Sequence, residues 1–206
     1  MVKEPKEFYL ELMQVVRNRL DVIEMLANSG VDDYGKAEMA AFHGRKIIEA
    51  IAFGCLIAIK NGLKHIPKDA QGQYNAETIF KMLNKKRIEV FPSPSLIRYA
   101  TQEEIKDHNV KGVIYGVPER RITKEELIKK YQRMHNWLHE LNPYTKDGQE
   151  IFHQKNALQL WKDLDEVSLF LQSHVMSIKG EAFFCILKDK IDGLTKVSSL
   201  SKISSI

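Results

Sequence analysis

The stretch FHGRKIIEAIAFGCLIAIKNG, residues 42–62, decides the fold of this chain. It makes up most of a predicted helix, residues 36–61, whose second half is apolar around almost the whole circumference. A helix with no polar face is buried, so we expect this segment to be the central element of the core. Glu49 and Lys60 interrupt the apolar run of residues 47–63, which is too short and too charged to span a bilayer.

Other helices are predicted on both sides of this central segment. Their expected positions are residues 5–28, a short helix after Asn75, and residues 101–108, 123–141 and 150–173. Two of the starts carry the spacing of a capping box, Thr101 with Glu104 and Thr123 with Glu126. We expect the helices of residues 36–61 and 123–141 to pack side by side.

Extended structure is predicted in three places. FPSPS, residues 91–95, has two prolines and reads as an extended crossing segment, and residues 110–119 read as a short strand or loop. HVMSIKGEAFFCILKD has β-branched and aromatic residues on both sides of a Lys-Gly-Glu turn, which predicts a hairpin near residues 174–188. The fold class predicted is mainly α, a helical bundle with a small C-terminal β-hairpin. Residues 1–190 are expected to form a single domain, and residues 191–206 a Ser-rich tail that is mobile or serves in interactions.

Composition narrows the class of protein. The chain has 206 residues, 44% hydrophobic and 28% charged, with a formal net charge of +4, which excludes wholesale disorder and a polytopic membrane protein. The mild positive charge permits RNA contact without arguing for it, because it is not gathered in one block. Cys55 and Cys185 lie in apolar surroundings, so we expect free thiols in a reducing cytoplasm. The N-terminal residues carry carboxylates where a secretory signal would need an apolar core.

The signatures of most large enzyme classes are absent from the sequence. It has no phosphate-binding glycine loop, no Gly-x-Ser-x-Gly elbow and no paired-cysteine zinc motif. No cofactor is therefore predicted, and the candidate site residues are polar groups on otherwise apolar helices.

The first candidate cluster lies at the entrance to the apolar helix. Arg45 and Glu49 are four residues apart, so they share a helix face and can pair. One interpretation is a structural ion pair that orients the core helix. The other is that Arg45 points into a cleft and holds a phosphate or a carboxylate.

The second candidate cluster is YQRMHNWLHELNPY, residues 131–144. Arg133 and His139 match the R-x(4–6)-H spacing of nucleases of the HEPN superfamily, in which His transfers a proton and Arg stabilises the phosphate, often across a dimer. His135 and Asn142 share a helix face with His139, and with Tyr131 and Glu49 they are the candidate substrate-binding residues. The structural alternative is that His139 bonds the turn at Asn142.

A zinc site is a third interpretation of the same histidines. His135 and His139 at i and i+4 could bind a metal ion, but the third ligand would have to be His153 or Asp163 from the next helix. The sequence places no such ligand, and our prediction is that the chain holds no metal.

Three separated blocks give the chain a family resemblance. Residues 42–58, the helix ending in LHELNPY and the closing segment 174–189 are similar to blocks found in the same order in a family of uncharacterised bacterial and phage-associated helical proteins. The resemblance covers roughly residues 35–190 and implies a shared site built from Arg45 and His139. The family's Cys in the second block is Met134 here, which argues against a thiol-dependent activity. The link to HEPN-like proteins, antiviral defence and toxin–antitoxin systems is an analogy.

Two hypotheses follow. The first is a non-catalytic helical interaction module that binds a partner protein, a second copy of itself or nucleic acid, in which Arg45, Glu49 and His139 form a polar network. The second is a metal-independent, HEPN-like RNA-cleaving effector with Arg45, Arg133 and His139 as catalytic residues. Neither hypothesis involves a membrane.

Overall fold

The computed structural model describes residues 3–30, 32–63, 66–70, 72–108, 110–139, 148–178 and 181–201. Its helices are α1 (Pro5–Ala27), α2 (Tyr34–Leu63), α3 (Ala76–Lys85), α4 (Gln102–His108), α5 (Lys124–Asn136) and α6 (Gln149–Leu171). Short 3-10 turns cover Lys68–Ala70 (η1) and Pro118–Arg120 (η2). The strands are β1 (Ser93–Tyr99), β2 (Gly112–Gly116), β3 (Ser173–Ile178), β4 (Glu181–Ile186) and β5 (Lys196–Ser201). The chain is mainly α, as predicted.

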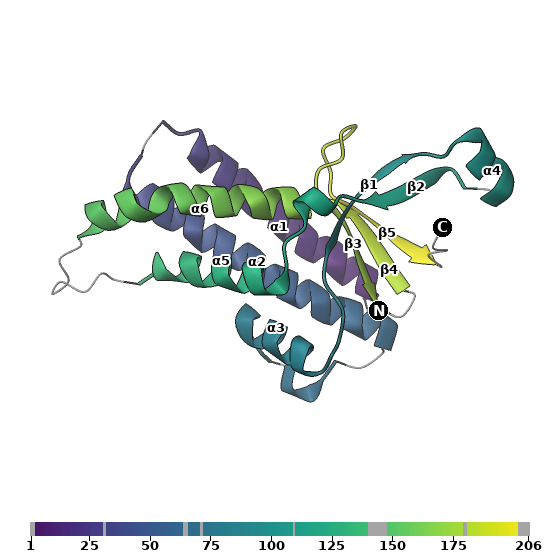
Figure 1. The fold of residues 1–206 in the computed structure, drawn as a ribbon, viewed down its shortest axis with the longest axis horizontal. Helices are drawn as coiled ribbons and strands as arrows, with labels where there is room; N and C mark the ends of the chain where they lie inside the picture. Colours follow the sequence, from purple (N-terminus) through teal and green to yellow (C-terminus); the bar gives the residue numbers. More distant parts are fainter. Residues whose placement is uncertain are drawn as a thin grey trace.

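Helix α2 is the centre of the core, as its sequence predicted. It packs against α1, α3, α5, α6 and the strands β3 and β4 (Figure 1). Ile47, Ile51 and Ile59 are almost completely buried. Gly44 lets α5 and α6 approach α2 closely, because a Cβ there would lie 2.4 Å from Leu164 Cδ2 and 2.8 Å from Met134 Sδ. The predicted side-by-side packing of the helices from residues 36–61 and 123–141 is therefore confirmed.

Helix starts agree with the capping residues. Asn75 Oδ1 accepts a hydrogen bond from the Thr78 amide at 3.1 Å, and Thr123 and Glu126 form a reciprocal capping box. Helix α5, however, ends at Asn136 rather than at residue 141. Residues 140–147, which include the candidate site residue Asn142, lie outside the described part of the chain.

The β-sheet is larger than the sequence predicted. The expected hairpin is present as β3 and β4, but it belongs to a five-stranded antiparallel sheet in the order β2-β1-β3-β4-β5. The prediction of a small hairpin is therefore wrong, because the extended segments before and after the hairpin pair with it. The predicted tail also differs, since Lys196–Ser201 forms β5 and Val197 packs opposite Cys185. Without β5, the outer edge of β4 would have unpaired backbone N–H and C=O groups. The pairing of β5 with β4 gives these groups hydrogen-bond partners.

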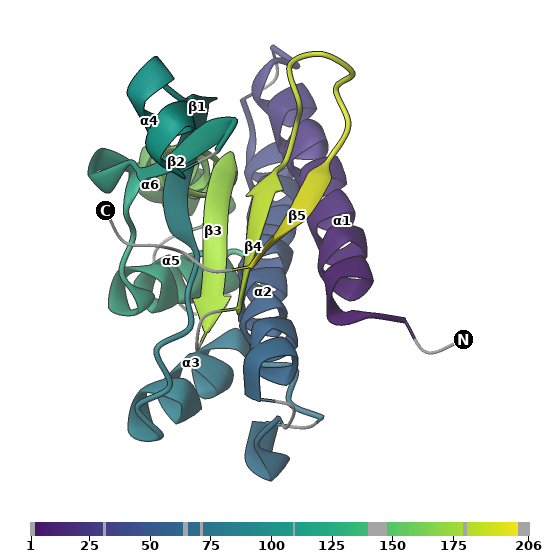
Figure 2. The same ribbon diagram turned by 90° about the vertical axis from the view of Figure 1, so that its right-hand side faces the viewer.

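One face of the sheet lies against α1 and α2 (Figure 2). Tyr9 of α1 stacks on Phe183 of β4 with ring centroids 5.3 Å apart. The Tyr9 hydroxyl lies 2.6 Å from Nε2 of His174, whose Nδ1 is 3.1 Å from the carbonyl oxygen of Leu171. His174 is completely buried, so this hydrogen-bonded chain joins the sheet to the helical layer through the core.

The strands β1 and β2, with α4 between them in the chain, form an arm that extends beyond the helical body (Figure 1). We call residues 95–116 the arm. Arg98 of β1 donates two hydrogen bonds of 2.8 Å to the carboxylate of Glu104, and these bonds hold α4 against β1. In the described part of the chain, no helix is both long enough and apolar enough to cross a membrane.

Candidate functional site

Arg45 and Glu49 of α2 meet Tyr131 of α5 in a polar network between the two core helices. Arg45 Nε lies 3.3 Å from Glu49 Oε1 and donates to the Tyr131 hydroxyl oxygen at 3.2 Å. The Tyr131 hydroxyl donates to Glu49 Oε1 at 3.3 Å, and Lys46 Nζ donates to the other carboxylate oxygen at 2.7 Å. The Glu49 side chain is only 8% exposed, whereas Arg45 is 25% exposed. The predicted pair is therefore real, and a tyrosine that the sequence placed 86 residues away completes it.

Tyr131 keeps its proton in this network. Burial is the main reason that its pKa is raised above the ordinary value of tyrosine, and the negative charge of Glu49 adds to it. Hydrogen bonding from Arg45 acts in the opposite direction and is outweighed. Tyr131 is thus a hydrogen-bond donor that holds Glu49, and the guanidinium of Arg45 lies over its ring at 5.3 Å from the centroid.

Replacing Glu49 by alanine should destabilise the fold. The change removes the acceptor of a buried hydroxyl and the partner of two cations, and we expect a loss of about 1–3 kcal/mol in the free energy of unfolding. Arg45 and Lys46 keep part of their hydration, which holds the loss below that of a fully buried pair. Urea denaturation measures the change. The double variant Arg45→Met/Glu49→Leu should recover stability, and an unchanged midpoint in Glu49→Ala would show that the network is not structural.

His135 and His139 form a second contact at the end of α5. Their Nε2 atoms are 2.9 Å apart, and His139 is exposed while His135 is half-buried. The pKa of His135 is lowered below the usual value of histidine, first by burial and then by the charges of Arg45 and His139. The positive charge of Arg45 therefore acts on His135 as well as on Glu49. Of the candidate residues, the structure places His139 in direct contact with His135.

Arg133 is not part of this group. Its guanidinium makes two hydrogen bonds, of 2.6 and 2.8 Å, to the carboxylate of Asp163 on α6. The R-x(4–6)-H spacing therefore does not join Arg133 to His139 in the described structure, because Arg133 turns toward α6 and His139 contacts His135. Asp163 is completely buried and also accepts from Lys130 at 3.0 Å and from Gln159 at 2.9 Å.

Asp163 is the centre of an ion-pair cluster that was not predicted from the sequence. Burial alone would raise the pKa of Asp163, but hydrogen bonds from Arg133, Lys130 and Gln159 outweigh burial and hold it below its usual range. Asp163 lies next to Leu164, one of the helically spaced apolar residues of α6. This position on the apolar side of the helix was the one sign in the sequence that its carboxylate would be buried. Lys130 also pairs with Glu166.

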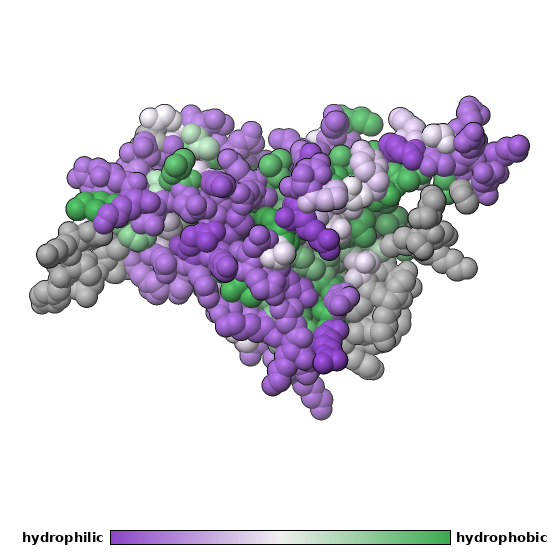
Figure 3. Space-filling model, in the orientation of Figure 1, coloured by the Kyte–Doolittle hydropathy of each residue, from purple (hydrophilic) through white to green (hydrophobic). Residues whose placement is uncertain are grey.

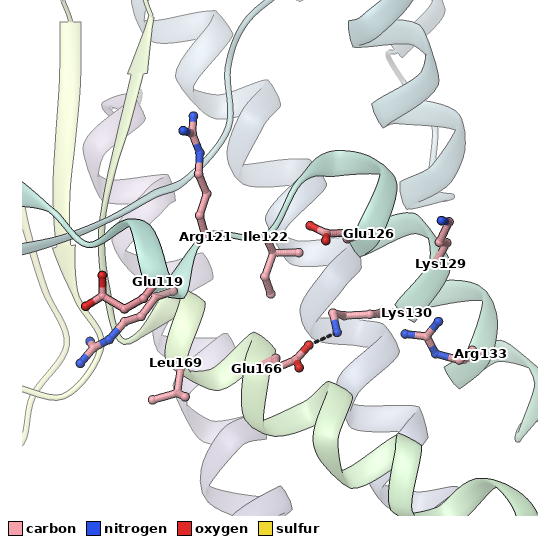
Figure 4. Close-up of a pocket in the computed structure, with 10 residues that line it drawn as sticks. Glu119, Arg121, Ile122, Glu126, Lys129, Lys130, Arg133, Glu166 and Leu169 are labelled. Carbon is pink, nitrogen blue, oxygen red and sulfur yellow. Dashed lines mark hydrogen bonds and ion pairs between the residues drawn. The ribbon is translucent and has the colours of Figure 1, made fainter.

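A hollow of about 430 Å³ lies between η2, α5 and α6. Figure 4 shows Lys130 and Glu166 facing each other across it. Its lining is strongly charged and comprises Glu119, Arg120, Arg121, Ile122, Glu126, Lys129, Lys130, Arg133, Glu166 and Leu169. Of the predicted catalytic residues, Arg133 lines this hollow, whereas Arg45 and His139 do not. Residues 119–121 were not among the predicted site residues, although two of them are arginines.

Neither residue considered as the third zinc ligand, His153 or Asp163, joins His135 and His139 in the structure. His153 Nε2 lies 3.2 Å from Asp32, and Asp163 is held by Lys130 and Arg133. Within the described ranges, no three His, Cys, Asp or Glu side chains gather in a way that could hold a metal ion.

The remaining candidate residue, Asn142, lies outside the described part of the chain. Comparisons with protein-family models, with curated proteins and with solved structures found no match to this chain.

Proposed function

We propose that this chain is a non-catalytic helical interaction module that binds a partner protein through its arm. The observation that carries the proposal is the exposure of large apolar side chains on the arm. Ile97 is 53% exposed, Tyr99 93% and Tyr115 45%. Ile97 and Tyr99 lie on one face of β1, and an exposed apolar patch of this kind is characteristic of protein interaction sites.

The register of the arm places two of these side chains on one face and the third on the other. Ile97 lies opposite Ile114 and on the same face of β1 as Tyr99, whereas Tyr115 lies on the other face, opposite Leu96. Figure 3 shows hydrophobic residues continuing from the base of the arm over the neighbouring sheet. Of the described residues of β1, those beyond Pro94 pair with β2 alone, so one backbone edge is open to a further strand. An open edge beside apolar side chains favours binding by strand addition.

The polar residues of the core support the same proposal. Arg45, Glu49 and Tyr131 satisfy one another, and Arg133 is held by Asp163. Such internally satisfied groups tie α2, α5 and α6 together, which is a structural role.

The cellular setting belongs to this proposal too. Cys55 and Cys185 are buried free thiols, which fits a reducing cytoplasm. A role in bacterial defence or in a toxin–antitoxin system rests on the family resemblance described above. A second copy of the chain is the first partner to test.

Site-specific photo-crosslinking tests the arm. A photoreactive phenylalanine analogue at position 99 should give a crosslinked band in bacteria and with the purified chain, whereas the same analogue at Tyr74, which is 80% exposed outside the arm, should not. Adding Ile97→Asp should abolish the band, because a charge on the apolar face disfavours burial. Lys106→Ser, on α4 of the same arm, is the matched control and should leave the band unchanged. Equal bands at positions 99 and 74, or no band at 99, would contradict the proposal.

A second candidate function is metal-independent RNA cleavage, and the histidine pair favours it. A neutral imidazole beside an exposed one, with an arginine in electrostatic range, could transfer a proton and stabilise a phosphate. In this function His139 would transfer the proton and Arg45 would hold the phosphate.

The test is an RNA-cleavage assay. Labelled single-stranded RNA and tRNA are incubated with wild type, His139→Ala, Arg45→Lys and the control His43→Ala, with and without EDTA. We expect His139→Ala to lose at least about 100-fold in rate, as for other general acid–base residues, and Arg45→Lys to be poorly tolerated because bidentate binding is lost. His43→Ala and EDTA should leave the rate unchanged. Equal rates for wild type and His139→Ala would reject this function.

A further inference from the structure

The contact between His135 and His139 has the geometry of a metal chelate. The two Nε2 atoms are 2.9 Å apart, while the ring centroids are 4.3 Å apart and the ring planes are inclined by 72°. If the rings met end to end, the distance between their centroids would exceed the Nε2 separation by the full offset of both nitrogen atoms from their centroids. The observed excess is smaller, so the rings meet at an angle. A straight N–H···N hydrogen bond would place them end to end.

We propose that His135 and His139 together bind one divalent first-row transition metal ion, with Cu²⁺ preferred over Ni²⁺ and Zn²⁺. With metal–nitrogen bonds of about 2.0–2.1 Å, the observed Nε2 separation gives an N–metal–N angle of about 90°. That angle suits square-planar or tetragonal Cu²⁺ and Ni²⁺ rather than tetrahedral Zn²⁺. Imidazole is a preferred ligand of these ions, and the Irving–Williams order places Cu²⁺ first.

The surroundings keep the pair ready for a cation. Arg45 would oppose a further positive charge, but its own charge is compensated by Glu49 at 3.3 Å. His139 is exposed, which opens a path from solvent and leaves positions for water ligands.

Two protein ligands set the strength of the site. Within the described ranges no third His, Cys, Asp or Glu joins the pair, and His135 Nδ1 is buried without a hydrogen-bond partner there. Metal-binding histidines are usually held by a partner at the second nitrogen, so this site should bind more weakly than a structural zinc site. The proposal is independent of partner binding by the arm.

Metal titration of the EDTA-treated chain tests the site. We expect isothermal titration calorimetry to give one Cu²⁺ per chain and weaker binding of Ni²⁺ and Zn²⁺. Loss of a group that merely supports a ligand costs about 10–100-fold in affinity, so His135→Ala and His139→Ala should each cost at least about tenfold. His43→Ala and His153→Ala should bind as wild type does. Electron paramagnetic resonance of the Cu²⁺ form should show coupling to two imidazole nitrogens, and one in each single variant.

Two controls separate the outcomes. His139 is exposed, so His139→Ala should fold, and its thermal melt without metal should match that of wild type. Ile97→Asp should bind Cu²⁺ normally, so that failure of the arm and failure of the metal site are distinguishable. Equal Cu²⁺ affinity in wild type and His135→Ala/His139→Ala would overturn the proposal. Absence of Cu²⁺ binding by wild type would also overturn it and would leave a pair that shares only a proton.

Discussion

Replacing Asp163 by alanine should lower the free energy of unfolding by about 3 kcal/mol, the lower end of the range for breaking a buried ion pair. Asp163 is completely buried and accepts hydrogen bonds from Lys130, Arg133 and Gln159. Without the carboxylate, Lys130 remains as a buried cation, because its side chain is only 7% exposed. Glu166 still contacts Lys130 and limits the loss.

Urea denaturation at neutral pH measures this effect against a matched control. Asp165 lies two residues along the same helix and is exposed, so Asp165→Ala should change stability by less than about 0.5 kcal/mol. The double variant Asp163→Leu/Lys130→Met removes both charges and should be closer to wild type than Asp163→Ala. If Asp163→Ala and Asp165→Ala had the same midpoint, the cluster would not hold α5 and α6 together.

Acid should destabilise the chain through His174. Burial lowers the pKa of His174 from 6.5 to about 4, because the protonated imidazole would be a buried charge. The unfolded chain therefore binds a proton at this residue between about pH 6.5 and about pH 4, while the folded chain does not. As the pH is lowered across that window, the free energy of unfolding decreases by about 1.4 kcal/mol per pH unit and by roughly 3 kcal/mol in total.

Denaturation of wild type and His174→Gln across the same pH window isolates this contribution. Glutamine cannot titrate, so the variant should be less stable at neutral pH but should lose less stability as the pH falls. Carboxylates with lowered pKa, such as Asp163, contribute equally to both curves. His139→Gln is the control, because His139 is exposed. Parallel curves for wild type and His174→Gln would contradict this prediction, because they would show that His174 has the same pKa in the folded and the unfolded chain.

The helices could be predicted from the sequence because their determinants are local. Each backbone hydrogen bond of a helix joins residues four apart, so apolar spacing and the capping residues Asn75 and Thr123 suffice to locate it. The pairing of Arg45 with Glu49 is local in the same sense. Its third member, Tyr131, could be identified as a candidate but not as a partner of Glu49, because the two residues are 82 apart in the chain.

The sheet and the ion-pair cluster required the tertiary structure. Lys196–Ser201 has no strong strand pattern, and it is a strand because β4 offers an unpaired edge. Arg133 satisfies the nuclease spacing with His139, yet its partner is Asp163, 30 residues away. The spacing of residues along one helix predicts which side chains share a face, but it does not predict which neighbouring helix packs against that face.

The sequence by itself therefore determined the mainly α class, the central buried helix and the position of the β3–β4 hairpin. Only the tertiary structure decided that five strands pair, that Arg133 contacts Asp163 and that Tyr131 contacts Glu49. The physical reason is the separation along the chain between the residues that form each interaction. Helix propensity and caps act within a few residues, whereas strand pairing and buried ion pairs depend on segments brought together by packing.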